Sequence, residues 1–146
     1  MSRRLAIGAL VYLVPTFALG YVWHLILFKD YYGALAMYRP DVIIPFGLLS
    51  MSIQALLFAF VYEASFARRV EGVGALALPY TAFGAALSWS FTTIAVAAKN
   101  VMSSVPDYLL IETAFTAVQW LMVGPLTALV LARGTRAGLA SSPIEN

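Results

Sequence analysis

Residues 5–28 read LAIGALVYLVPTFALGYVWHLILF and contain no Asp, Glu, Lys or Arg. A helix needs about 20 mostly apolar residues to cross the hydrocarbon core of a bilayer, and this stretch is longer than that. It is also longer than the apolar region of a cleaved signal peptide, and no A-x-A-like cleavage site follows it. We therefore expect residues 5–28 to form a transmembrane helix that the protein retains.

Three further stretches have the same character, and short charged connectors separate them: residues 42–62, 73–98 and 108–132. Only the last of them contains an acidic or basic residue, Glu112. Residues 133–146 form a polar tail with Gly, Ser and Pro, which we expect to lack regular structure. The sequence thus predicts an all-α membrane protein in which residues 1–132 form a bundle of four transmembrane helices.

The composition excludes several classes of protein. Of the 146 residues 62% are hydrophobic and only 11% are charged, whereas a soluble domain carries about 25% charged residues. There is too little polar surface to cover a water-soluble globule, so the lipid bilayer is the expected partner. The net charge of +2 is scattered and forms no basic patch, which argues against binding to nucleic acid.

The inventory of reactive side chains is also small. Cysteine is absent, which excludes disulfides, thiolate metal sites and thiol-based redox enzymes. The single histidine excludes bis-histidine ligation of haem within one chain. No HExxH, GxSxG or glycine-rich phosphate motif is present, and we expect neither a metal nor a cofactor. The sequence favours a protein that is not an enzyme, although it leaves the question of catalysis open.

The basic residues predict the orientation, because Lys and Arg concentrate in the cytoplasmic connectors of membrane proteins. The first and third connectors carry only Lys29, Arg39 and Lys99, and the remaining basic residues lie at the N-terminus, in the second connector and in the tail: Arg3, Arg4, Arg68, Arg69, Arg133 and Arg136. We expect both termini to be cytoplasmic, in a bacterial inner membrane. An aromatic belt would then lie at the outer interface, formed by Tyr31, Tyr32, Tyr38 and Tyr108.

The two halves of the chain share features in the same order: Pro15 and Gly20 match Pro79 and Gly84, Pro40–Asp41 matches Pro106–Asp107, and Gln54 matches Gln119. This order is compatible with two duplicated helical hairpins in a parallel repeat. We expect each Asp to cap the helix that follows it. The repeat places the two Gln residues at the same depth, near the centre of the bilayer.

Two ionisable residues lie inside the predicted spans, near the same outer edge. His24 is four residues from the end of the first span, and Glu112 is four residues into the last. Intramembrane ionisable groups usually face the bundle interior and find a partner there. We therefore expect His24 and Glu112 to meet directly, through water or through a ligand. The alternative is that His24 reaches the headgroups and Glu112 pairs at the surface with Lys29 or Lys99.

The candidate residues for binding a ligand or coupling a proton lie on the polar faces of three helices: His24, Gln54, Glu112, Thr116 and Gln119. The first helix adds small and polar residues that recur every fourth position: Gly8, Tyr12, Thr16, Gly20 and His24. We expect these faces to meet inside the bundle. The first connector, residues 29–39, mixes aromatic and charged side chains, so it is either a short interfacial helix covering the bundle mouth or a simple membrane anchor.

Three functions are compatible with this pattern. The first is a small-molecule-binding or carrier protein with a polar pocket that opens outward. The second is a proton-coupled transporter, as a homodimer, in which Glu112 exchanges a proton for substrate. The third is a non-catalytic accessory subunit of a larger membrane complex.

The segment from Trp23–His24 to Tyr31–Tyr32, with the four spans and short connectors, resembles a group of small bacterial inner-membrane proteins known only as domains of unknown function. The resemblance covers most of the chain and implies a four-helix membrane fold. It carries over no catalytic residue. Small multidrug transporters also have four helices, but they carry an essential acid in the first helix, and this chain has none there.

Overall fold

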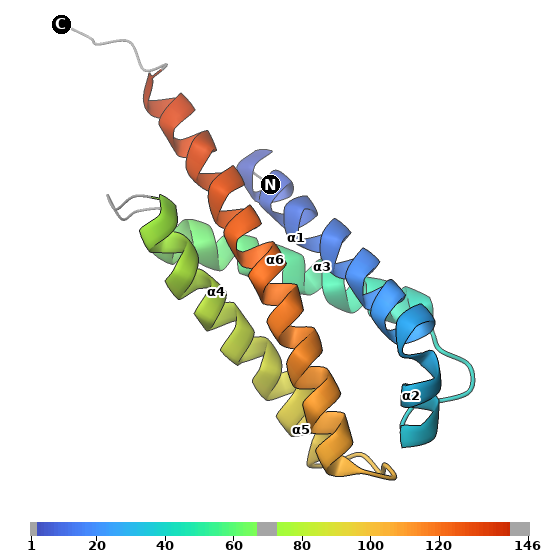
Figure 1. Ribbon diagram of the computed structural model, residues 1–146. Coiled ribbons are helices and arrows are strands. Elements are labelled where there is room, and N and C mark those ends of the chain that lie inside the picture. Colours follow the sequence, from blue (N-terminus) through green and yellow to red (C-terminus); the bar gives the residue numbers. More distant parts are fainter. Residues whose placement is uncertain (1–2, 67–72, 141–146) are drawn as a thin grey trace, which may run out of the picture.

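The structure, a computed structural model, describes residues 3–66 and 73–140, except for the side chains at 73, 74, 76 and 133–140. Its regular elements are all helical (Figure 1): α1 (Arg3–Val22) with the π-helical turn η1 (Trp23–Leu27), α2 (Lys29–Leu35), α3 (Ile44–Val61) with η2 (Tyr62–Phe66), α4 (Val73–Trp89) with η3 (Ser90–Ile94) and α5 (Ala95–Ala97), and α6 (Val105–Ala140). The predicted all-helical fold is confirmed over these residues.

Three of these helical stretches are long and apolar enough to cross a membrane: Arg3–Leu27, Ile44–Phe66 and Val105–Ala132. They indicate an integral membrane protein. The fourth predicted span, residues 73–98, is helical up to Ala97 but is not among the three, because its Pro, Tyr, Ser and Thr residues lower its hydropathy. The count of four spans therefore stays a prediction, as does the duplication.

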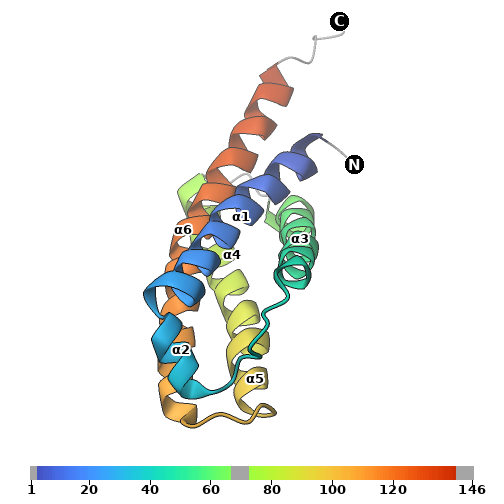
Figure 2. The same ribbon diagram turned by 90° about the vertical axis from the view of Figure 1, so that its right-hand side faces the viewer.

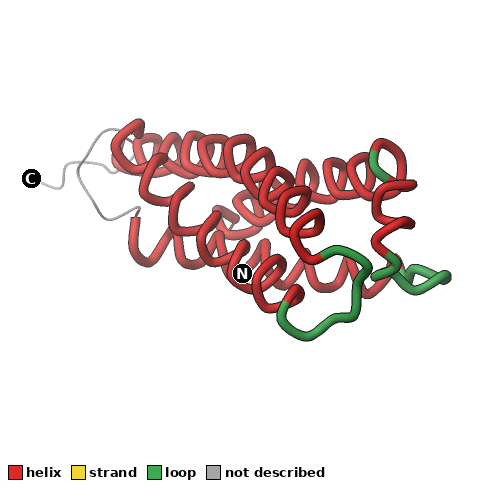
Figure 3. The backbone as a smooth tube through the Cα atoms, turned by 60° about the horizontal axis from the view of Figure 1, so that its bottom comes forward, coloured by secondary structure: helices red, strands yellow, loops and turns green. Residues whose placement is uncertain are grey.

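The helices form a bundle in which α1 lies between α3 and α6, and α4 lies along α6 (Figure 2). The described loops gather at one end of the bundle, opposite the end at which α6 finishes (Figure 3). The start of α1 lies toward the same end as the last turns of α6 (Figure 1). We call this end the inner end and the loop end the outer end.

An aromatic cluster in the inner half holds the four long helices together: Tyr12, Phe58, Tyr62, Tyr80 and Trp120. The rings of Phe58 and Trp120 meet edge to face with centroids 4.7 Å apart, and the Tyr12 and Phe58 rings have centroids 5.2 Å apart. The phenol of Tyr62 donates to the carbonyl of Ala128 at 3.2 Å, and that of Tyr80 donates to the carbonyl of Phe58 at 3.3 Å. Polar tips bonded across helices are a main source of helix association where lipid surrounds the bundle.

Two glycines let α4 and α6 approach closely. Gly84 lies against the Trp120 ring, and Gly124 lies against Thr81. A Cβ atom at either glycine would overlap with these neighbours. Small residues at helix crossings serve this purpose in membrane bundles. The Trp120 ring is further fixed by its Nε1, which donates to the Ser88 hydroxyl at 2.9 Å.

The predicted helix caps are wrong. Asp41 binds Arg39 in the loop, at 3.1 and 3.3 Å, and α3 begins only at Ile44. In α6 it is the Ser104 hydroxyl that caps, accepting the N–H of Asp107 at 3.4 Å. Proline is tolerated in the first turn of a helix because its missing N–H is not needed there, so α6 starts before the Pro–Asp pair rather than after it.

The predicted tail also begins later than expected. Residues 133–140 continue α6 as a helix, since nothing in this segment breaks the pattern before Ala140. Residues 141–146 lie outside the described residues, and so do Arg68 and Arg69, on which part of the predicted orientation rests.

Gly84→Ala tests the close approach of α4 and α6. We expect the variant to lose about 1–3 kcal/mol of stability, because the added methyl group must displace the Trp120 ring. Thermal unfolding in detergent measures the loss. Gly47→Ala is the control, because a Cβ atom there meets nothing within 4 Å. Equal melting temperatures for the two variants would contradict the packing described.

Candidate functional site

His24 and Glu112 form a direct pair at the outer end of the bundle. Nε2 of His24, in η1, lies 3.2 Å from Oε1 of Glu112, in α6. The predicted approach of these two residues is confirmed. Glu112 is only 5% exposed. It therefore pairs with His24 inside the bundle and not with a lysine at the surface.

The local fold of α1 holds the imidazole in place. His24 lies at the start of the π-helical turn, and its Nδ1 is 2.9 Å from the Gly20 carbonyl one turn earlier. Its ring meets Phe115 of α6 edge to face, with centroids 4.5 Å apart. Gly20 leaves room for Met51 and Phe115, which a Cβ atom there would contact at 3.3 and 4.0 Å. The absence of a side chain at position 20 thus lets α3 and α6 close on the His24 turn.

A third residue, Tyr32 of α2, completes the group. Its phenol donates to Oε1 of Glu112 at 2.6 Å, and the residue is 1% exposed. Burial raises the pKa of the Tyr32 phenol, and the neighbouring Glu112 raises it further. The phenol therefore keeps its proton and acts as the donor. We refer to His24, Glu112 and Tyr32 as the outer triad.

The hydrogen bonds of the outer triad indicate how many protons it holds and between which atoms they lie. The Gly20 carbonyl can only accept, so Nδ1 of His24 carries a hydrogen. One further proton lies between Nε2 and Glu112, either as imidazolium with carboxylate or as imidazole with carboxylic acid. The pair is neutral overall in both forms. This neutrality reduces the cost of placing an acid inside a membrane span.

Helix α2 covers the Glu112 side of the triad and is fastened at its end. The Ser103 N–H donates to the Leu35 carbonyl at 3.0 Å, and the Ser103 hydroxyl donates to the Ala34 carbonyl at 2.8 Å. Tyr32 and Leu35 pack with Tyr108 in a small buried cluster. A short helix was one of two expectations for this connector, and the structure places it at Lys29–Leu35.

The predicted aromatic belt is wrong for two of its four members. Tyr32 and Tyr108 are buried, and the Tyr108 phenol donates to the Thr92 carbonyl at 2.6 Å. Tyr31 and Tyr38 remain exposed. A tyrosine near a membrane surface can turn its polar tip toward water or toward a buried acceptor, and the sequence carries no periodic signal that distinguishes these cases. This is why Tyr32 was not among the predicted site residues.

A second polar group lies deeper in the bundle. The Gln119 amide donates to the Tyr12 phenol at 3.2 Å, and that phenol donates to Oε1 of Gln54 at 3.3 Å. The Gln54 amide in turn donates to the Ser50 hydroxyl at 3.2 Å. The two predicted glutamines are therefore joined through a single tyrosine. Tyr12 was on the four-residue pattern of the first helix, and that position was the signal for its role.

Four of the five predicted site residues are thus divided between two hydrogen-bonded groups, and Thr116 lies between these groups on α6. Three cavities border them separately. His24 borders a cavity between α1 and α3, Gln54 borders one between α3 and α4, and Thr116 borders a shallow groove between α4 and α6. Aromatic side chains separate these residues. The rings of Tyr32 and Phe115 pack around His24, and Tyr12 lies between the two glutamines.

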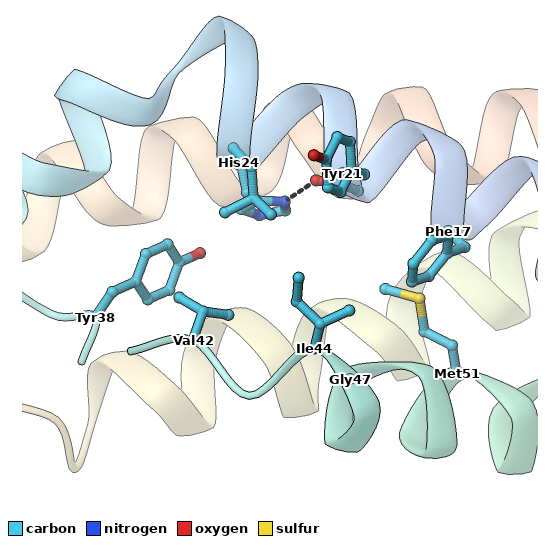
Figure 4. Close-up of a pocket in the computed structure, with 10 residues that line it drawn as sticks. Phe17, Tyr21, His24, Tyr38, Val42, Ile44, Gly47 and Met51 are labelled. Carbon is cyan, nitrogen blue, oxygen red and sulfur yellow. Dashed lines mark hydrogen bonds between the residues drawn. The ribbon is translucent and has the colours of Figure 1, made fainter. Parts of the chain in front are cut away.

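The cavity between α1 and α3 has a volume of about 290 Å³ (Figure 4). His24 and Tyr38 lie toward one end, and Phe17 and Met51 lie at the other (Figure 4). The remainder of the wall is mostly apolar and includes Gly47 of α3. Tyr38 turns its hydroxyl toward the interior, which adds a hydrogen-bonding group beside His24 (Figure 4).

Comparison with known proteins yields no match among family models, curated proteins or solved structures. The function must therefore be argued from the site itself.

Tyr32→Phe tests the outer triad. We expect a loss of about 1.5–3 kcal/mol, because a hydrogen bond to a charged or proton-sharing group is removed while the ring is kept. Thermal unfolding in detergent measures it. Tyr31→Phe is the matched control, since that phenol makes only a 3.5 Å contact with the Asp107 carbonyl in an exposed position. If the two variants unfold alike, Tyr32 does not stabilise the triad.

Proposed function

We propose that the chain crosses the membrane four times, with both termini in the cytoplasm of a bacterium. Residues 73–97 form a helical stretch about 37 Å long at 1.5 Å per residue, enough for a hydrocarbon core of about 30 Å. This stretch lies along α6, so it occupies the same layer of the bilayer as the spanning part of α6. Ser90 and Thr92 bond to carbonyls one turn earlier, which lowers the cost of their hydroxyls in lipid.

The orientation has support at the inner end. The start of α1 and the last turns of α6 lie at the same end of the bundle, as an even number of spans requires (Figure 1). Arg3 and Arg4 lie at the start of α1, and Arg4 pairs with Glu63 at 3.1 Å. Basic residues favour the cytoplasmic side, so this end is assigned to the cytoplasm.

The protein binds a small, mostly apolar molecule that carries one polar group. The observation that supports this function is the cavity between α1 and α3, whose wall is apolar except toward one end. There the Tyr38 phenol supplies a hydrogen-bonding group beside the His24 ring, whose nitrogens contact Gly20 and Glu112. Ligand sites typically combine an apolar wall with a few polar groups that fix the orientation of the ligand.

The ligand enters from the membrane. Tyr21, Val42 and Ile44 border the cavity and are 46%, 48% and 44% exposed. In a bilayer these side chains face lipid, so the cavity opens sideways into the outer half of the hydrocarbon layer. A lipid-soluble molecule reaches it without passing through water, with its polar group toward the outer surface.

A matched pair of tryptophan variants tests the cavity. Gly47→Trp fills it from a position where the backbone has room, whereas Leu49→Trp adds the same ring at an exposed position outside the cavity wall. The probe is a decyl alcohol carrying a photoactivatable diazirine, used with protein in lipid nanodiscs. We expect saturable labelling of residues that line the cavity. Gly47→Trp should lower the affinity for the probe about tenfold or more, a loss of about 1.4 kcal/mol. Leu49→Trp should leave the affinity unchanged.

Labelling spread over lipid-facing residues such as Leu110 and Leu121, and insensitive to Gly47→Trp, would show that the probe reports only lipid contact. The binding function would then be abandoned.

Proton-coupled transport is a second candidate, favoured by the single proton that His24 and Glu112 share. Both ring nitrogens of His24 are engaged within the protein. A ligand with an amino group can replace His24 as the partner of Glu112, and the shared proton then leaves. Binding of an amine would thus release at most one proton per molecule.

This candidate has its own measurement. Decylamine is added to the protein in weakly buffered nanodiscs, and released protons are followed with a pH-sensitive dye. We expect release by the native protein and none by Glu112→Gln. Asp107→Asn is the matched control, because it removes the same charge from the first turn of α6. If the native protein binds decylamine without releasing protons, coupling is excluded and the binding function stands.

A further inference from the structure

Two hydrogen-bonded groups lie along the interface of α1 and α6, and a short polar layer separates them. The helices run in opposite directions and are tied at two levels, by the contact of His24 with Glu112 and by that of Tyr12 with Gln119. Thr16 lies one turn beyond Tyr12 on α1, and Thr116 one turn beyond Glu112 on α6. The two threonines therefore lie at the level between the two ties.

The hydroxyls of these threonines are buried. Thr16 is 1% exposed and Thr116 is 3% exposed. The Thr116 hydroxyl has no hydrogen-bond partner among the described residues, and the Thr16 hydroxyl lies beside the Tyr12 phenol of the deeper polar group. Leaving a buried hydroxyl unpaired is costly, and buried water typically fills such positions when two to four polar groups can hold it.

Glu112 supplies a further acceptor at this level. Both of its hydrogen bonds described above end on Oε1, from Tyr32 and from His24, so Oε2 retains its capacity to accept. Glu112 and Thr116 are four residues apart on one helix, a spacing at which side chains are neighbours. The carboxyl group and the two hydroxyls thus lie on adjacent turns of α1 and α6, at the level between the two ties.

We propose that this layer binds water, held by Thr16, Thr116 and Glu112, and that the water joins the outer triad to the Gln119–Tyr12–Gln54 chain in one hydrogen-bonded path. The path starts under α2 at the outer end and continues through Gln54 to the Ser50 hydroxyl of α3. Below it lie Val123, Ala128 and Leu131, which are buried and apolar. A glutamine amide does not take up a proton near neutral pH, so the path couples the orientation of the Gln54 amide to the hydrogen bonds of His24 and carries no proton across the membrane.

Water fits the layer better than a metal cation. A cation is drawn to a site with net negative charge, and the His24–Glu112 pair is neutral in both of its protonation forms. The residues that the structure describes contain no cluster of three His, Cys, Asp or Glu side chains. The ionisable groups that surround the pair are the phenols of Tyr32, Tyr38 and Tyr108.

Two threonines of α6 give a matched test of the bound water. Thr127 resembles Thr116 in that it is buried and its hydroxyl has no partner among the described residues. Its neighbours one turn away, Val123 and Leu131, are apolar, so α6 offers no acidic or hydroxyl partner for a water molecule beside it as Glu112 does for Thr116. We expect Thr116→Val to lower the melting temperature by about 2–4 °C, and Thr127→Val to leave it unchanged or raise it.

The path itself is tested through the single histidine. The protein, produced with ¹⁵N-labelled histidine and a histidine-free tag, gives signals from His24 alone. Gln54 has no hydrogen bond to His24 among those described, so the Thr116→Val background separates an effect through the path from one through the packing of α3 on α1. We expect Gln54→Leu to move the His24 ring signals in the native background and in Thr127→Val, but not in Thr116→Val. Thr116→Ser keeps the hydroxyl and should restore the effect.

Three results would overturn the proposal. The first is a Thr116→Val protein at least as stable as the native one. The second is a response of His24 to Gln54→Leu that survives in Thr116→Val. The third is a native melting temperature that is higher in sodium chloride than in choline chloride, with the difference lost in Thr116→Val, since that would place a cation in the layer. None of these results bears on probe binding in the α1–α3 cavity, so the two ideas fail separately.

Discussion

The contact between His24 and Glu112 is the constraint on which the outer half of the molecule depends. An isolated carboxylate is expensive inside a membrane, and a partner that shares one proton with it removes the net charge. The pair ties the end of α1 to the start of α6. Tyr32 adds α2 to the same carboxyl oxygen, so three elements far apart in the sequence are fixed by one acid. Without Glu112, the position of α2 would rest on the two Ser103 hydrogen bonds at its end and on the small cluster around Leu35 and Tyr108.

The inner half is held by a different kind of interaction. Aromatic rings from α1, α3, α4 and α6 fill it, and close contacts at Gly84 and Gly124 draw α4 against α6. The buried residues of α3 lie only in its second half, and they include Phe58 and Ala59. Its first half stands apart, with Phe46 68% exposed. The cavity toward α1 flanks this first half, whereas the cavity toward α4 borders the second half of α3 from Gln54 onward.

This division connects the architecture with the proposed function. The aromatic cluster closes the bundle at the inner end, and the outer half leaves space between α1 and α3 beside a polar group. The cavity between α1 and α3 reaches His24 from the lipid side, whereas Glu112 is approached from the α2 side. A bound molecule and the shared proton therefore meet at a single imidazole, which is the feature that makes the pair a candidate for coupling binding to protonation.

The amino-acid sequence by itself determined the helices and indicated the membrane environment, and it predicted, beside the alternative of surface contacts, that His24 and Glu112 meet. These follow from the length of apolar runs and from the cost of a buried charge, which are properties of local sequence. The tertiary structure alone decided that Tyr32 and Tyr12 complete the polar groups, that Ser104 caps α6, and that the five candidate residues border different cavities. Helical periodicity shows which face of one helix is polar. It does not show how far neighbouring helices are rotated or separated, and that geometry depends on side chains distant in the sequence.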